Sequence, residues 1–263
     1  MPSAVDLSSV EAALIDSTSS EWSSPSHHLA RPILAAGSSV EFSGYRRPIE
    51  ASELGWVHAA ISSVLDRPHS QTHRDMGSLI RQSWSMRPWP CESGLAVVWW
   101  DEADAAAVVG RRYSARIGRI PVGVRFGPLT RVHAPPRWLP GAYAVRLATR
   151  SPVVIRRDGG KNLTHLEPTG MSIESALVTL QRKLGLPTEI KPSIRILDAR
   201  TEVVGASVRG KTGEIIGWSG TVDMLCSARA RWLLECASRG LGLGGRGAYG
   251  FGAIHVTSLE GRT

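Results

Sequence analysis

Residues 240–252 read Gly-Leu-Gly-Leu-Gly-Gly-Arg-Gly-Ala-Tyr-Gly-Phe-Gly and contain seven glycines in thirteen positions. Glycine accepts positive φ and leaves its amide unshielded, so successive N–H groups can surround phosphate oxygens. We therefore predict a phosphate-binding loop, in which Arg246 adds a charged fork to the backbone of Gly242, Gly244, Gly245 and Gly247. The alternative is a tight connection with a purely structural role, although a connection alone needs fewer glycines.

The order of elements around this loop argues against a nucleotide cofactor. Gly242, Gly244 and Gly247 match the spacing GxGxxG, but the dinucleotide fingerprint needs a strand before the glycines and a helix after them. Here a helix is expected before the loop and a strand after it. The GxxxxGK[ST] pattern is also missing from the sequence. We therefore expect no cofactor.

The C-terminal half predicts a ferredoxin-like order of elements, βαββαβ. In the helix expected over residues 171–184, Ile173, Leu177 and Leu180 keep the helical period. For the last helix, we expect Leu225, Ala228, Trp232 and Cys236 to be buried, and Arg229, Arg231, Glu235 and Arg239 to lie mainly elsewhere. The expected elements are a strand over 143–155, the helix 171–184, strands 193–197 and 214–219, a helix over 223–239 capped by Gly240, and a strand over 251–256.

The length of the chain and the positions of its prolines and glycines predict two domains. A chain of 263 residues can bury two cores, and prolines and glycines are concentrated in residues 134–141. We place the boundary there, between domains of residues 1–140 and 141–263. In the first domain, residues 50–65 predict a helix with His58 on its apolar face, where a core role is expected, and residues 95–100 predict a buried strand.

The charge of the chain points to an anionic partner. The formal net charge is +8, and arginine supplies 27 of the 31 basic residues. Guanidinium forks bind phosphate through two hydrogen bonds, which favours nucleic acid, although a GC-rich genome also favours arginine codons. The three cysteines show no CxxC pattern, so neither a disulfide framework nor a metal site is expected. With no signal peptide or long apolar run, we expect a cytoplasmic protein and no membrane partner.

From Tyr143 to Val256 the sequence resembles the CRISPR-associated repeat-processing endoribonucleases, the sixth Cas family of the RAMP superfamily. The resemblance is carried by Glu235 to Arg239, by the glycine-rich loop with its following strand, and by Gly213 to Gly220. It implies an α+β fold of two tandem ferredoxin-like (RRM-like, βαββαβ) domains with a C-terminal glycine-rich loop. A divergent, arginine-rich member, as in type IV systems, is the nearest description.

The resemblance also implies an activity. It is metal-independent cleavage of precursor crRNA, in which the 2′-hydroxyl attacks the adjacent phosphate and leaves a 2′,3′-cyclic phosphate and a 5′-hydroxyl. The implied partners are CRISPR repeat RNA and other Cas proteins of an effector complex. Such a reaction needs activation of the 2′-oxygen and cations that stabilise the charge of the transition state.

We expect the catalytic residues in the N-terminal domain, where the family usually places its histidine. His27 and His28 suit general acid or base chemistry. Tyr45, Arg46 and Arg47, with Arg31, form a second constellation, in which arginines act by positioning and charge. Adjacent histidines in a polar segment are also commonly inert.

A cluster of arginines completes the predicted RNA-binding residues. Arg112, Arg116 and Arg119 stand at i, i+4 and i+7, with Arg111 beside them, which predicts a helix with a basic face. Arg239 adds a further charge next to the glycine-rich loop. The alternative is a merely solvated basic face, broken by Gly110 and Gly118.

Two other functions fit the same sequence. A non-catalytic RAMP subunit would bind crRNA in an effector complex without cutting it. A general single-strand binder would stack bases on exposed aromatic residues, but Trp99, Trp100 and Trp232 lie in apolar patterns typical of a core.

Overall fold

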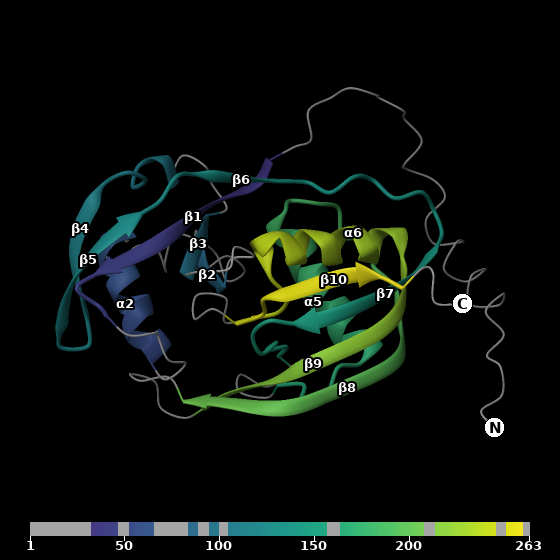
Figure 1. Cartoon of the computed structure of the whole chain (residues 1–263). Helices are drawn as coiled ribbons and strands as arrows, with labels where there is room; N and C mark the ends of the chain where they lie inside the picture. The colour runs from purple at the N-terminus through teal and green to yellow at the C-terminus, as the bar shows by residue number, and fades with distance from the viewer. Residues whose placement is uncertain are drawn as a thin grey trace.

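The computed structural model describes residues 33–46, 53–65, 84–88, 95–99, 105–156, 164–207, 214–245 and 251–259. Within them the chain has an α+β fold with two antiparallel sheets and few helices (Figure 1). The sheets lie side by side, the first formed by the N-terminal half of the chain and the second by the C-terminal half.

The first sheet has six strands in the order β2-β3-β1-β5-β4, and β6 also pairs with β1. One of its faces packs on helix α2 through a core that includes Val57, Ile61, Val97, Val124 and Phe126. The strands are β1 (Ile33–Ser43), β2 (Trp84–Pro88), β3 (Leu95–Trp99), β4 (Arg112–Ile117), β5 (Ile120–Phe126) and β6 (Thr130–His133), and α2 spans Leu54–Leu65.

The second sheet has four strands in the order β10-β7-β9-β8, all antiparallel. Helices α5 and α6 cover one of its faces, and the chain follows the predicted order βαββαβ. The elements are β7 (Ala142–Thr149), α5 (Gly170–Lys183), β8 (Ile194–Ser207), β9 (Glu214–Ser227), α6 (Ala228–Cys236), the π-helical turn η2 (Ala237–Leu241) and β10 (Ile254–Ser258).

Helix α5 forms where its sequence predicts it. Thr169 caps its first turn, because its side chain accepts a hydrogen bond from the Ser172 amide while its own amide donates to the Ser172 hydroxyl. Ile173, Leu177 and Leu180 are buried against the sheet. Gly185, at φ 65°, then lets the chain leave the helix.

The last helix begins later than expected, since residues 223–227 belong to β9. They pair with β7 and β8, and the helix starts only after Ser227, whose side chain accepts from the Ala230 amide. Arg229 and Arg231 are 6% and 7% exposed, so the expectation that they lie away from the core is wrong. Their long apolar stems make such burial compatible with a core helix.

The two halves share part of their core. Ala35, Val98, Val132 and Ala134 come from the N-terminal half, yet they join the buried cluster that includes Leu147 and Trp232. The two sheets are thus packed against each other by apolar side chains. Within the described residues, none of the helices is long and apolar enough to cross a membrane.

Candidate functional site

The arginines predicted to form a helical face lie instead on a β-hairpin. Arg112 and Arg116 belong to β4, and Arg119 follows Gly118 in the turn to β5. The prediction of a helix is wrong because the apolar residues here alternate with period two: Tyr113, Ala115 and Ile117 face inward while the arginines face outward. Gly118 makes the turn at φ 62° and lies against the Trp56 ring.

The hairpin keeps Arg112 and Arg116 on one face, since residues two and four apart in a strand point the same way. Arg112 lies directly opposite Arg125 of β5, which in turn lies opposite Glu41 of β1. All four side chains are exposed. We call this surface the arginine face; it comprises Ser39, Glu41, Ser43, Arg112, Ser114, Arg116, Gly123 and Arg125.

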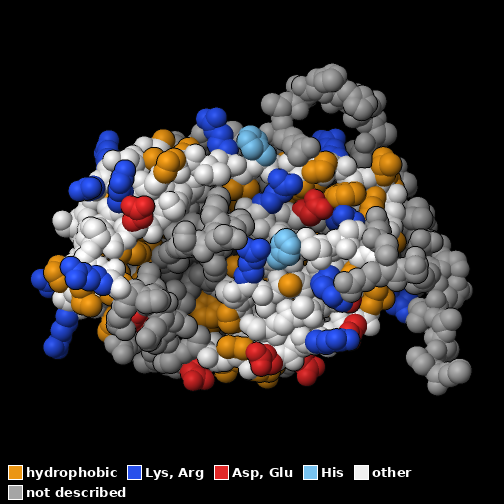
Figure 2. Space-filling model, viewed as in Figure 1, with side chains coloured by type: hydrophobic (Ala, Val, Ile, Leu, Met, Phe, Trp, Pro, Cys, Tyr) orange, Lys and Arg blue, Asp and Glu red, His pale blue; other side chains and the backbone are white. Residues whose placement is uncertain are grey.

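The arginine face suits a polyanion. Three guanidinium groups face one carboxylate, and the serines between them supply hydroxyl donors. Gly123 carries no side chain, and a Cβ there would collide with the Ser43 hydroxyl, so the centre of the face stays low. Figure 2 shows Lys and Arg side chains gathered over the part of the molecule formed by β4 and β5.

Other predicted site residues lie near the edges of this sheet. Arg111 precedes β4, Arg119 lies in the hairpin turn, and Arg46 follows β1; all three are exposed. Tyr45 is half-buried, and its hydroxyl donates to Oε2 of the buried Glu53 at 2.7 Å. This bond fixes the phenol of Tyr45 against α2.

The glycine-rich loop packs tightly on its own protein. The Gly242 amide donates to the Ala237 carbonyl at 2.9 Å, and the Gly245 amide donates to the Val154 carbonyl at 2.7 Å. A Cβ on Gly244, at φ 83°, would lie 2.5 Å from that same carbonyl oxygen. The Gly242 and Gly245 amides thus already donate to protein carbonyls, contrary to the expectation that they face a phosphate, and Gly244 serves close backbone packing.

The remaining predicted residues divide into two groups. Arg239 is exposed on η2, directly before the loop. The others lie outside the described residues, and their roles stay predictions: His27, His28, Arg31, Arg47, Arg246 and Gly247. The structure thus brings together Arg112 and Arg116 and adds Arg125 to them.

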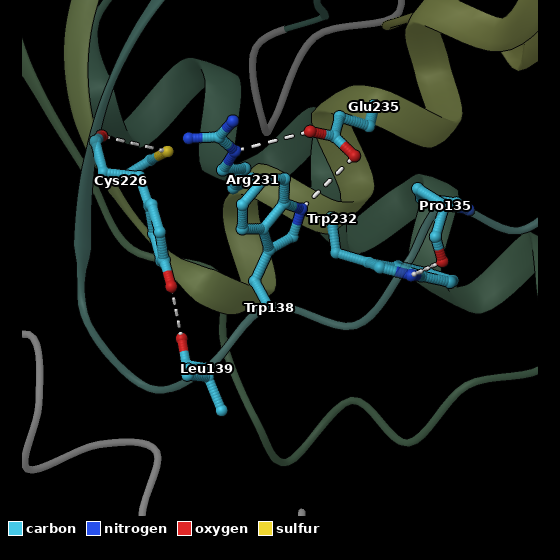
Figure 3. A network of polar contacts seen from close by, with 8 residues as sticks. Pro135, Trp138, Leu139, Cys226, Arg231, Trp232 and Glu235 are labelled. Atoms are coloured by element: carbon cyan, nitrogen blue, oxygen red, sulfur yellow. Dashed lines mark hydrogen bonds and ion pairs between the residues drawn. The ribbon is translucent and has the colours of Figure 1, made fainter. Parts of the chain in front are cut away.

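Sequence reasoning missed a polar network that joins the chain between β6 and β7 to α6. The Arg231 guanidinium lies 3.7 Å from the Trp138 ring centre and donates from Nε to Glu235 Oε1 at 3.3 Å (Figure 3). Trp138 Nε1 donates to the other oxygen of Glu235 at 3.2 Å. Only Glu235 and Arg231 share a helical spacing, so Trp138 could not have been assigned from sequence.

Trp232 adds a second tie, since its Nε1 donates to the Pro135 carbonyl at 3.2 Å. Its burial confirms the prediction of a core role. Because α6 leads directly into the glycine-rich loop, this network fixes the loop's starting point relative to the N-terminal half.

Burial raises the pKa of several titratable groups. It raises the pKa of the Cys226 thiol to about 12, and it raises the pKa of Cys236 as well. Burial also raises the pKa of Glu174, against the effect of a 2.6 Å hydrogen bond from the Ile194 amide. His58 is buried beside Ser62, in accord with its expected core position.

Neither a protein-family model nor a curated protein sequence matches this chain. Solved structures do match it, and several of them are Cas6 proteins.

A Cas6 product complex superposes with a TM-score of 0.55 at 15% identity, over 85% of this chain and 99% of its own. Thermus thermophilus Cas6 gives 0.52 at 13% identity, over 88% and 100%. A Cas6 substrate mimic complex gives 0.51 at 16%, over 86% and 99%. The chain therefore has the fold of Cas6 proteins, which confirms the resemblance seen in its sequence at the level of the fold.

Proposed function

We propose that this protein binds CRISPR repeat RNA and processes precursor crRNA as an endoribonuclease. The observation that carries the proposal is the Cas6 fold over most of the chain, together with an arginine face on its N-terminal sheet. The matching Cas6 structures include a product complex and a substrate mimic complex. In this account the division at residue 140 separates two ferredoxin-like domains.

The arginine face supplies the RNA contacts. Exposed guanidinium groups of Arg112, Arg116 and Arg125 bind phosphates along one strand, and Arg46, Arg111 and Arg119 extend the basic surface at its edges. Arg239, directly before the glycine-rich loop, and Arg246 within it add further charges. The loop's role then rests on these side chains, since its amides at Gly242 and Gly245 already donate to protein carbonyls.

The proposed chemistry is metal-independent. The 2′-oxygen attacks the adjacent phosphorus, the bond to the 5′-oxygen breaks, the 2′ proton passes to a base, and the leaving 5′-oxygen receives a proton. His27 or His28 serves as acid or base, and Arg31, Tyr45 and Arg46 position the phosphate or stabilise its charge. Cleavage assays on the His28→Ala and Arg46→Ala variants show whether the reaction depends on the histidines or on the residues that position the phosphate.

Binding is tested with a labelled repeat hairpin from a CRISPR array beside the gene, at physiological salt. We expect reversal of charge at Arg112 and Arg116 together to reduce affinity at least tenfold, since both phosphate contacts are lost. The matched control is Arg182→Glu, an exposed arginine on α5. If the unaltered protein, the Arg112 and Arg116 double variant and the Arg182→Glu control bind the repeat with equal affinity, the role of the arginine face is refuted.

A non-catalytic subunit that binds crRNA would pass this binding test as well. A cleavage assay distinguishes this subunit from the enzyme, because the subunit would leave the repeat RNA uncut.

A further inference from the structure

The face of the C-terminal sheet that α5 and α6 leave uncovered carries a second basic cluster, centred on a small residue. In β7, Val145 and Leu147 are buried toward the helices, so Arg146 and Ala148 point to the opposite face. Ala148 lies directly opposite His255 of β10 and Thr221 of β9. Directly opposed residues share a face, so all three side chains meet on the uncovered side.

Arg150 extends the cluster by one step beyond β7. Its amide donates to the Ala253 carbonyl at 2.8 Å, which continues the β7–β10 ladder past the last paired residue. Arg150 therefore follows Ala148 on the same face, about 7 Å further along the strand. Both Arg150 and His255 are exposed.

Arg146 closes the cluster on its other side and is held in place. Its Nε and Nη2 each donate to a carboxylate oxygen of Asp223 at 2.6 Å, the two residues being directly opposite across β7 and β9. This fork uses two of the five N–H donors of Arg146. Asp223 raises the pKa of Arg146, so its charge persists.

The hydrogen-bond donors around Ala148 favour an anion. Arg146, Arg150 and His255 surround its methyl group, and the Thr221 hydroxyl adds a neutral donor. Two carboxylates lie beside this group: Asp223 is bound by Arg146, and Asp198, directly opposite Asp223 on β8, is paired with Arg200. Because a methyl side chain is short, a ligand can approach the sheet at Ala148 and reach donors from three strands.

The cluster also lies at the exit of the glycine-rich loop. Gly252 and Ala253 lead directly into β10, and His255 is the second residue of that strand. Figure 2 shows a histidine and Lys or Arg side chains near one another on the visible face of the C-terminal half. A strand of RNA that contacts the loop would meet these residues next.

We propose that Arg150, His255 and Thr221, with Arg146 beside them, bind a phosphate of single-stranded RNA over Ala148. This inference rests on the proposed function, because it assumes that RNA is the ligand of the loop. The contacts address the backbone of the RNA and not its bases, so they add affinity without sequence preference.

The test measures RNA affinity by fluorescence anisotropy at several salt concentrations, with Arg150→Ala and His255→Ala. We expect each variant to bind repeat RNA about five- to tenfold more weakly, and Arg150→Ala to reduce the slope of log affinity against log salt by about 0.7. Arg150→Lys keeps the charge and should retain most of the slope. An unrelated single-stranded RNA should lose affinity by the same factors.

Matched controls are Arg182→Ala on α5 and His133→Ala at the end of β6, both exposed and away from this cluster. If Arg150→Ala and His255→Ala bind like these controls, while the Arg112 and Arg116 variants lose affinity, the phosphate site is refuted and the proposed function stands. If the unaltered protein does not bind repeat RNA, the proposed function itself fails. Thermal unfolding of each variant verifies that it is folded at the temperature of the binding assay.

Discussion

Arg112 on β4 lies directly opposite Arg125 on β5, so two guanidinium groups share one cross-strand position at the edge of the N-terminal sheet. Like charges in this arrangement destabilise a sheet, by roughly 0.2–1 kcal/mol. Glu41, on the other side of Arg125, offsets part of the repulsion. A pair that costs stability and faces solvent is better explained by an anionic ligand than by the fold.

Replacement of Arg112 by Thr should separate the effect of this arginine on stability from its effect on RNA binding. Thr suits an exposed strand position and removes the repulsion, so we expect the free energy of unfolding to stay the same or to rise by up to about 1 kcal/mol. RNA affinity should fall at the same time, because one phosphate contact is lost. Urea unfolding and RNA binding of the same protein check both halves. A variant that is clearly less stable would show that Arg112 is needed for the fold.

The glycine-rich loop offers a matched pair of substitutions. At Gly244, positive φ and the nearby Val154 carbonyl both oppose a Cβ, so Gly244→Ala should destabilise the protein by about 1–3 kcal/mol. At Gly245 the nearest atom to a Cβ is 3.6 Å away, so Gly245→Ala should change the free energy of unfolding by less than about 0.5 kcal/mol. Denaturant unfolding compares them. Equal losses would contradict the packing role assigned to Gly244.

Trp138 should contribute to stability through both its ring and its Nε1. We expect Trp138→Ala to cost about 2 kcal/mol, because the ring leaves Arg231 and Glu235, whereas Trp138→Phe should cost about half as much by losing only the hydrogen bond to Glu235. Leu139→Ala is the control, since this neighbour is 79% exposed. The network would be dispensable if the two Trp138 variants unfolded like the Leu139 variant.

Cys226 and Cys236 should resist thiol reagents in the folded protein. Burial raises the pKa of Cys226 to about 12, so little thiolate exists at pH 8, and both side chains are buried. Because the folded pKa exceeds the unfolded value of about 8.5, stability should decrease as pH rises above that value. Labelling with iodoacetamide, followed by peptide mapping, should modify both residues only after unfolding. Rapid labelling of native Cys226 would disprove its burial.

The C-terminal elements could be predicted because their signals are local. Ile173, Leu177 and Leu180 mark a helix by their spacing, and Gly185 ends it, so α5 lies where expected. Strand β9 continues to Ser227, well past the predicted end at Ser219, because its pairing with β7 and β8 is a tertiary interaction. Propensity along one segment does not reveal such partners.

The arginine hairpin shows how a candidate site can be right in its residues and wrong in its structure. Arg112 and Arg116 are four residues apart, a spacing that places them on one face of a helix and also on one face of a strand. The alternation of Tyr113, Ala115 and Ile117 favoured the strand and would have identified Arg125 through its partner Arg112. The positions of Ala148, His255 and Thr221 depend on register between three strands, which no sequence spacing contains.

The proposed reaction is tested most directly by incubating the purified protein with a repeat RNA in the presence of EDTA and determining the ends of the products by mass spectrometry. We expect one cut in the repeat, with a 2′,3′-cyclic phosphate on one fragment and a 5′-hydroxyl on the other. An RNA with a 2′-deoxy nucleotide at the cut should be bound and left intact. Uncut repeat RNA, or products with a 5′-phosphate, would contradict the proposed reaction.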